Sequence, residues 1–182
     1  MGMHDLNRLA KLIKKQNAIS NEIAALIGRP GEKGHVSEFI ASRIFKIALE
    51  DSASHKGVDG CFTDGALAGC TVDIKWYLKA EAVLNLNPES PADFYLVLTG
   101  PRAGATSSRG TSRPWVIESV FLFNTRELIG SLRARGIRIG IATSVRRQQW
   151  DEAEIYPVQR NRRLILADEQ RALLALFSQD AE

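Results

Sequence analysis

Hydrophobic positions in the first fifty residues follow helical spacing. Between residues 4 and 27 they recur at intervals of three, four and six to seven, at Leu6, Leu9, Ala10, Ile13, Ile19, Ile23, Leu26 and Ile27. A polar interval from Asn17 to Asn21 predicts a break into two helices. The run Gly28-Arg29-Pro30-Gly31 predicts a firm stop. A second helix is predicted over residues 34 to 50, and its broad apolar surface predicts that it is largely buried.

From residue 58 onward the pattern changes to that of strands. Residues 58 to 79 alternate between apolar and polar, with Asp64-Gly65 as a hairpin turn signal. The nearly continuous apolar run at 93 to 99 is typical of a central strand covered on both faces. Further elements are predicted in order: a loop at 102 to 113, a strand at 114 to 123, a helix from Asn124 or Thr125 to Arg135, a strand at 137 to 143, and a closing helix near 165 to 178.

This order of elements predicts an α/β fold whose mixed sheet is flanked by helices. The 182 residues are expected to form one domain, with a helical segment at 1–30, a core at 34–143 and an extension at 144–182. No apolar run approaches the length that crosses a bilayer, and no signal peptide is recognised at the N-terminus. A cytoplasmic protein with two reduced thiols, Cys61 and Cys70, is therefore expected.

Charged residues interrupt the second strand of the predicted hairpin. Asp73, Lys75 and Tyr77 share one face of that strand, and the alternate residues Val72, Ile74 and Trp76 share the other. The apolar face is expected to pack on the core. A carboxylate and an ammonium group are then left side by side on the opposite face.

The position of Asp59 depends on the register of the hairpin. A two-residue turn at Asp64-Gly65 would place Asp59 opposite Cys70, on the face away from Asp73. A three-residue connection would place it opposite Thr71, on the same face as Asp73. A β-bulge at Gly69 would have the same result, and glycine within a strand often marks a bulge. We predict one of these two arrangements.

Two carboxylates beside a lysine suggest metal-assisted hydrolysis. Mg²⁺ prefers hard oxygen ligands, and two carboxylates, a backbone carbonyl and water would supply them. A lysine next to such an ion can orient the attacking water and stabilise negative charge that develops on phosphorus. The pattern therefore indicates hydrolysis of a phosphodiester bond.

The same residues resemble the PD-(D/E)XK nuclease superfamily, which has the restriction-endonuclease-like fold. Asp59 in "GVDG" matches the first acid of its motif, "VDIKW" matches the second acid and the lysine as Asp73 and Lys75, and Glu38 matches an acid on the preceding helix. Val58 stands where the family usually has proline. The resemblance covers residues 34 to 143 and implies an αβββαβ core.

The resemblance also implies roles for these residues. Asp59, Asp73 and the backbone carbonyl of Ile74 would bind Mg²⁺, or Mn²⁺ in its place, and Glu38 would assist directly or through water. Lys75 would position the attacking water. The substrate implied is DNA, and a homodimer is expected because cutting both strands favours two sites related by two-fold symmetry.

Basic residues are distributed unevenly along the chain. All eight lysines lie at or before Lys79, and the thirteen bases after residue 100 are all arginines, which suit phosphate recognition. Arg102, Arg109 and Arg113 in the predicted loop, together with Arg146 and Arg147, are candidate contacts to nucleic acid. The sequence alone leaves open an ordinary solvated surface at these positions.

Other interpretations of the acidic residues remain open. Asp73 and Lys75 would also suit an exposed edge strand, Asp59 a turn, and Glu38 a partner for Arg43 or Lys33. The segment at 18–30 resembles the first helix of a helix-turn-helix, with residues 34 to 50 as the helix that reads DNA. That alternative describes a DNA-binding protein without catalysis, as does a nuclease-like fold used only for binding.

Overall fold

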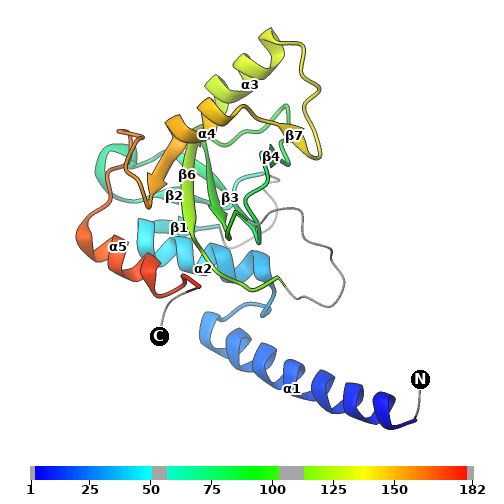
Figure 1. The fold of residues 1–182 in the computed structure, drawn as a ribbon. Helices are drawn as coiled ribbons and strands as arrows, with labels where there is room; N and C mark the ends of the chain where they lie inside the picture. The colour runs from blue at the N-terminus through cyan, green and yellow to red at the C-terminus, as the bar shows by residue number, and fades with distance from the viewer. Residues whose placement is uncertain (1–2, 51–56, 103–112, 180–182) are drawn as a thin grey trace.

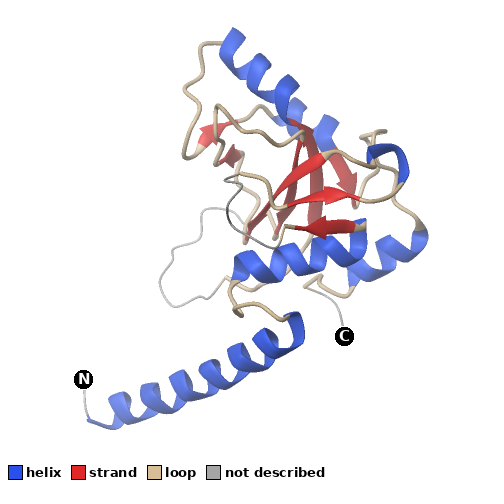
Figure 2. Cartoon of the chain, turned by 180° about the vertical axis from the view of Figure 1, so that it is seen from behind, coloured by secondary structure: helices blue, strands red, loops and turns tan. Residues whose placement is uncertain are grey.

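The computed structural model describes residues 3–50, 57–102 and 113–179, and it contains a six-stranded sheet with helices on both faces (Figures 1 and 2). The helices are α1 (Met3–Ile27), α2 (Lys33–Phe45), η1 (a 3-10 turn, Gly65–Leu67), α3 (Thr125–Ala134), α4 (Arg147–Ala153) and α5 (Asp168–Ala175). The strands are β1 (Ile47–Leu49), β2 (Gly60–Phe62), β3 (Thr71–Tyr77), β4 (Val83–Leu84), β5 (Phe94–Thr99), β6 (Ser119–Asn124), β7 (Thr143–Ser144) and β8 (Glu154–Tyr156).

The main sheet has the strand order β1-β2-β3-β5-β6-β8. β3 and β5 run parallel, and every other neighbouring pair is antiparallel. The sheet is therefore mixed, as predicted. β5 is buried along its whole length, which confirms the central strand expected at 93 to 99. β4 and β7 form a separate two-stranded sheet.

Each face of the main sheet has its own hydrophobic core. On one face α2 and α5 cover the sheet, where Ile40 and Ile44 of α2 pack with Val72, Ile74 and Trp76 of β3. On the other face α3 and α4 cover it, and their core residues include Leu128, Leu132 and Trp150. The alternation in β3 confirms that Val72, Ile74 and Trp76 face a core.

Several predicted boundaries are wrong. α1 is unbroken, so the residues from Asn17 to Asn21 remain helical. α2 ends at Phe45 because Lys46 adopts a left-handed conformation with φ of 54°. The chain then continues as β1, where Ile47 is buried against β2. The predicted strand at 114 to 123 begins only at Ser119.

The predicted strand at 137 to 143 is also wrong. The main chain there is irregular up to Thr143, whose hydroxyl accepts from the N–H of Gly140 and donates to its carbonyl. Ala142 has a positive φ of 55°, so the extended conformation is interrupted within the run. Sequence reasoning also missed α4 and β8, and β8 forms the outer strand of the main sheet.

The connection between β2 and β3 is longer than either predicted arrangement. Gly60 pairs with Val72 and Cys61 with Thr71, so η1 lies within the connection. The Asp64 side chain caps η1 by accepting from the N–H of Gly65, and Leu67 is buried. This register differs from the predicted three-residue connection by two residues. The predicted pairing of Asp59 opposite Thr71 is therefore wrong, because Cys61 is the partner of Thr71.

α1 is the longest helix among the described residues, and it extends away from the sheet (Figures 1 and 2). Within the described part of the chain, no helix is both long enough and apolar enough to cross a membrane.

Candidate active site

One edge of β3 opens beside α2. β2 pairs with β3 only at Thr71 and Val72, and no described strand pairs with β3 on this side beyond Val72. In β3, alternate residues turn both their N–H and C=O groups toward the same edge. Val72, Ile74 and Trp76 therefore direct these groups toward the edge away from β5. We call the stretch from Ile74 to Trp76 the free edge of β3.

Side chains bind the polar groups of this free edge. The Asp59 carboxylate accepts a hydrogen bond of 2.6 Å from the N–H of Ile74. The Lys33 ammonium, at the start of α2, donates to the Trp76 carbonyl at 2.7 Å. Asp59 also donates its own N–H to Val72, although Gly60 is the register partner of Val72. Two residues thus oppose one at the end of β2, as in a bulge, which turns Asp59 toward β3.

Gly60 allows β2 to pack closely against β1. A Cβ atom at this residue would lie 2.5 Å from the Ala48 carbonyl oxygen and 2.7 Å from Cγ2 of Ile47. Only glycine fits without displacement of β1 or β2. Gly60 therefore helps to set the position of the neighbouring Asp59.

The pKa of the Asp59 carboxyl is raised to about 6. Burial is the main cause, and the negative charges of Asp73 and Glu38 raise it further. The hydrogen bond from Ile74 and the positive charge of Lys75 act in the opposite direction. Glu38, Asp73 and Lys75 therefore all lie close enough to Asp59 to shift its pKa, although the four residues come from α2, the position before β2 and the middle of β3.

Asp73 and Lys75 form a close pair on the side of the sheet opposite Ile74. The Lys75 ammonium lies 2.8 Å from both carboxylate oxygens of Asp73, and it also lies 5.2 Å from the centre of the Tyr95 ring. Asp73 is only 8% exposed. Burial raises its pKa, and Lys75 partly offsets that rise. Both side chains are less than 20% exposed, so the interpretation of Asp73 and Lys75 as the exposed face of an edge strand is wrong.

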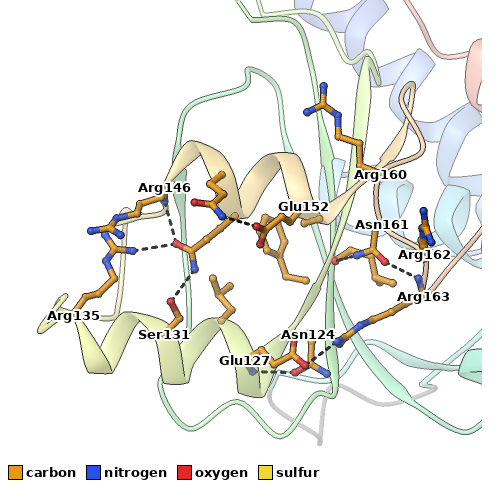
Figure 3. A pocket seen from close by; sticks show the side chains of 16 residues that line it. Asn124, Glu127, Ser131, Arg135, Arg146, Glu152, Arg160, Asn161, Arg162 and Arg163 are labelled. Carbon is orange, nitrogen blue, oxygen red and sulfur yellow. Dashed lines mark hydrogen bonds and ion pairs between the residues drawn. The ribbon is translucent and has the colours of Figure 1, made fainter.

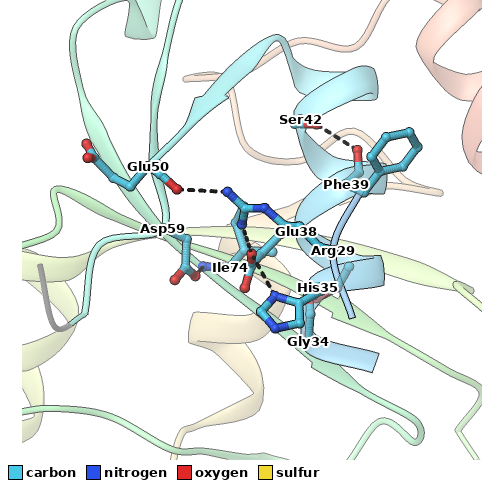
Figure 4. A network of polar contacts seen from close by, with 10 residues as sticks. Arg29, Gly34, His35, Glu38, Phe39, Ser42, Glu50, Asp59 and Ile74 are labelled. Carbon is cyan, nitrogen blue, oxygen red and sulfur yellow. Dashed lines mark hydrogen bonds and ion pairs between the residues drawn. The ribbon is translucent and has the colours of Figure 1, made fainter. Parts of the chain in front are cut away.

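Glu38 points from α2 toward Asp59 and forms an ion pair with Arg29 (Figure 4). Arg29 donates to Glu38 at 2.7 Å and, through its other terminal nitrogen, to the Glu50 carbonyl at 2.8 Å. Nδ1 of His35 lies 3.5 Å from the same carboxylate oxygen. Arg29 is thus the principal partner of Glu38, in place of the Arg43 or Lys33 considered from the sequence.

The donor set suits a hard cation, but the carboxylates are not arranged as a finished metal site. Among the described residues, no three His, Cys, Asp or Glu side chains are grouped closely enough to hold a metal ion. Asp73 is paired with Lys75, and Glu38 with Arg29. Asp59 adds a carboxylate whose charged form is disfavoured, and the Ile74 carbonyl faces the same free edge. A cation would relieve this charge and would displace one or both bases from their present partners.

Three of the predicted arginines lie near the end of β3. Arg102 and Arg147 line a hollow with Glu81 and Trp150, and the positive charge of Arg113 acts on Glu81. Arg109 lies outside the described residues.

The remaining predicted arginine, Arg146, lines a larger groove of about 540 Å³ (Figure 3). The groove also includes four other arginines: Arg135, Arg160, Arg162 and Arg163. Two of these are paired with acids, since Arg160 lies 3.3 Å from Glu154 and Arg163 lies 2.8 Å from Glu127. The groove is formed by β6, α3, α4 and the segment after β8, and therefore lies toward the other edge of the sheet from β2.

Arg29 and Lys33 are the functional candidates that sequence reasoning missed. Both belong to the run "GRPGEKG" between α1 and α2. The turn there brings the start of α2 against the free edge of β3, and no spacing rule predicts such a contact across 43 residues. The only sequence signal was a basic pair that flanks the turn.

Comparison of the chain with protein-family models finds no match, and comparison with curated protein sequences finds none either. The function is therefore inferred from the geometry of the site and from the motif that its residues form.

Proposed function

We propose that this chain is a metal-dependent nuclease of restriction-endonuclease-like fold that hydrolyses phosphodiester bonds in DNA. The observation that carries the proposal is that Glu38, Asp73 and Lys75 all shift the pKa of Asp59, whose carboxylate binds the Ile74 N–H at the free edge of β3. Buried carboxylates with raised pKa values cost stability, and such clusters are concentrated at functional sites.

Four groups would hold the metal ion. They are the carboxylates of Asp59 and Asp73, the backbone carbonyl of Ile74 and, directly or through water, Glu38. These are oxygen donors of the kind that Mg²⁺ and Mn²⁺ accept. When bound, the ion would neutralise charge on the phosphate and lower the pKa of a water molecule.

Two lysines would take part in the reaction: Lys75 would position the attacking water, and Lys33 would contact a phosphate oxygen of the substrate. The Lys75 ammonium donates two hydrogen bonds to Asp73, and the same N–H groups can hold a water molecule when Asp73 turns to a cation. Lys33 lies at the same free edge and brings a second positive charge for a phosphate oxygen. Burial lowers the pKa of Lys33, because it disfavours the charged ammonium.

The arginine surfaces supply sequence-independent contacts to a nucleic-acid backbone. Arg102, Arg113 and Arg147 lie around the end of the strand that carries Asp73 and Lys75. The groove that contains Arg146 lies beside β6, α3 and α4, toward the other edge of the sheet from β2. A duplex that contacts both surfaces would pass over the helices α3 and α4. The resemblance to the nuclease superfamily favours DNA as the substrate, and we propose that the enzyme is cytoplasmic.

A DNA-binding protein without catalysis is the second candidate function. It is favoured by one observation, namely that Asp73 and Glu38 are each neutralised by a base. The helix-turn-helix version is less well supported, because Ile40, Ile44 and Phe45 of α2 are buried against the sheet. A helix that reads the major groove must expose its contact face.

A cleavage assay tests the proposal. The wild type is incubated with plasmid DNA in Mg²⁺, in Mn²⁺ and in EDTA, beside Asp73→Ala and Lys75→Ala. We expect metal-dependent cleavage by the wild type and none by either variant. Glu89→Gln is a matched control, because Glu89 forms an exposed ion pair with Arg133. Binding of DNA without cleavage in either metal would favour the non-catalytic function.

A further inference from the structure

α1 has few contacts with the rest of the chain. All its described side chains from residue 4 to 19 are exposed, and only Ser20, Ile23, Ala24 and Ile27 are half-buried, near α2. Figures 1 and 2 both show the N-terminal part of this helix extending away from the sheet. Helices without packing partners are marginally stable in water. The first two-thirds of α1 therefore lack the contacts that normally stabilise a helix.

Four of the six large exposed apolar residues of α1 fall on one heptad seam, and the other two, Leu6 and Ile13, lie beside it at e positions. The seam positions are spaced alternately by three and four residues, and they are Leu9, Leu12, Gln16, Ile19, Ile23 and Leu26. This spacing is that of the a and d positions of a coiled coil. The four exposed apolar members are Leu9 at 49%, Leu12 at 53%, Ile19 at 58% and Leu26 at 77%. Such a seam, about 26 Å long, is open to a second helix.

The charges of α1 distinguish between the two directions in which a second copy could pair. The first half contains four bases and one acid, namely Arg8, Lys11, Lys14, Lys15 and Asp5, and Glu22 is the only charged residue from position 16 to 27. A parallel pair would place the two basic halves beside each other. An antiparallel pair would place each basic half beside the half that contains Glu22, which removes this repulsion.

The antiparallel arrangement also matches the seam in a single register. When Leu9 packs against the partner's Leu26, Leu12 meets the partner's Ile23. Gln16 then meets the partner's Ile19, and two-fold symmetry repeats all three layers. Lys15 and Glu22 each directly precede a seam residue, so Lys15 lies beside the partner's Glu22. Hydrophobic packing and charge thus favour the same alignment.

We propose that α1 is a self-association helix that forms an antiparallel coiled coil with α1 of a second copy of this chain. The contact is isologous, because the same surface of each copy takes part. Ile23 and Ile27 are half-buried near α2, so the seam continues the apolar surface between α1 and the rest of the chain. The proposal does not depend on nuclease activity, and it holds for either candidate function.

Sedimentation equilibrium of the full chain over about 1 to 100 μM tests the proposal. We expect a dimer for the wild type. The double variant Leu12→Glu/Ile19→Glu should weaken dimerisation at least about a hundredfold, because it places charges within the seam. Both residues are more than half exposed, so the fold should be retained, as judged by the thermal transition. Lys14→Glu, outside the seam, should leave the dimer unchanged.

A charge exchange tests the antiparallel direction. Lys15→Glu and Glu22→Lys should each raise the dimer dissociation constant roughly tenfold, because each places like charges together twice per dimer. The double variant Lys15→Glu/Glu22→Lys should restore dimerisation to within about threefold of the wild type. Failure of the double variant to recover would overturn the antiparallel register.

Two results would overturn self-association itself. One is a wild type that remains monomeric at the highest concentration, and the other is a Leu12→Glu/Ile19→Glu variant that dimerises as the wild type does. A basic amphipathic helix can also bind anionic membranes. Vesicles of phosphatidylserine and phosphatidylcholine therefore serve as a comparison. A monomeric wild type that binds these vesicles, while Leu12→Glu/Ile19→Glu does not, would replace the second copy by a membrane surface.

Discussion

The segment from the end of α2 through β3 contains two aspartate–lysine pairs with similar geometry and different surroundings. At the connection before β3, Lys46 lies 2.6 Å from Asp64, and both side chains are at least 60% exposed. In the middle of β3, Lys75 lies 2.8 Å from Asp73, and both side chains are less than 20% exposed. The first pair lowers the pKa of its aspartate through a hydrogen bond to Lys46. The second fails to do so, because burial raises the pKa of Asp73 more than Lys75 lowers it.

The difference shows that pairing alone does not identify a functional charge. The outer pair is an ordinary surface contact that solvent screens. The inner pair keeps two charges in a place where they are costly, beside a second carboxylate, the half-buried Asp59. A buried ion pair is weak evidence for stabilisation, so its retention favours a role in function.

The largest expected difference between the two pairs is in catalysis. Asp73→Asn should reduce the rate of Mg²⁺-dependent DNA cleavage by about a thousandfold or more, because it removes a proposed metal ligand. Asp64→Asn is the matched change at the outer pair and should leave the rate within about twofold. Single-turnover cleavage of a labelled duplex measures both. Equal losses in the two variants would remove the distinction between the pairs.

The next effect is on stability. Lys75→Met leaves the Asp73 carboxylate buried without its partner, and we expect a loss of about 2 to 3 kcal/mol in the free energy of unfolding at pH 7.5. Lys46→Met should leave the urea midpoint unchanged within error, because Asp64 remains in contact with water. Urea denaturation followed by circular dichroism compares the two. A larger loss of unfolding free energy in Lys46→Met than in Lys75→Met would contradict the expectation that the inner pair matters more.

Asp59 should make stability depend on pH in an unusual direction. Its pKa of about 6 in the folded state lies above the ordinary pKa of an aspartate, 3.8, so the folded state holds the proton more tightly. Stability should therefore fall as pH rises from about 4 to about 6. Asp59→Asn retains an oxygen acceptor for the Ile74 N–H, and it should raise stability at pH 7.5 by about 1 to 2 kcal/mol after allowance for solvent screening.

Urea midpoints at several pH values test this effect. The gain from Asp59→Asn should be present above pH 6 and absent near pH 4. Asp64→Asn again serves as a control. Its aspartate has a lowered pKa, so any effect of that substitution should have the opposite sign. A gain from Asp59→Asn that is independent of pH would show that charge is not its cause.

The smallest expected effect concerns Arg29. Its removal frees Glu38 and adds negative charge near Asp59, so Arg29→Ala should lower the Mg²⁺ concentration needed for half-maximal binding by about threefold. Arg43→Ala is the control, because Arg43 is exposed and contacts the Phe39 ring on the same helix. The shift in thermal midpoint with added Mg²⁺ measures both. If Mg²⁺ shifts the thermal midpoint of Arg29→Ala at the same concentrations as that of the wild type, Arg29 does not compete with the cation.

The sequence predicts which residues of β3 face the core better than it predicts the connection between β2 and β3. The period of two in "TVDIKWY" separates Val72, Ile74 and Trp76 from Asp73 and Lys75, because each strand has only two faces. The mixed sheet and the buried β5 follow from similar local patterns. The length of the connection before β3 does not, because Asp64-Gly65 is a hairpin signal that in this chain caps a 3-10 turn. The buried Leu67 stabilises that longer path.

Tertiary contacts account for the other errors and omissions. The run at 137 to 143 alternates like a strand, but the Thr143 hydroxyl binds the backbone of Gly140 and closes a turn. Arg29 reaches Glu38 only because the chain reverses between α1 and α2. Local periodicity contains no information about such contacts. It placed Asp73 and Lys75 on one face of β3, whereas Glu38 was proposed from the resemblance to the nuclease superfamily.

Isothermal titration of Mg²⁺ into the protein at pH 6 tests the central claim most directly, because the proposed site binds a cation with or without DNA. We expect one site per chain, with release of protons from Asp59, whose pKa is about 6. Titrations in two buffers of different ionisation enthalpy reveal that release. Asp64→Asn should bind Mg²⁺ as the wild type does, and Asp73→Asn should not. Mg²⁺ binding that is absent in the wild type, or unchanged in Asp73→Asn, would contradict the assignment of a metal site to the free edge of β3.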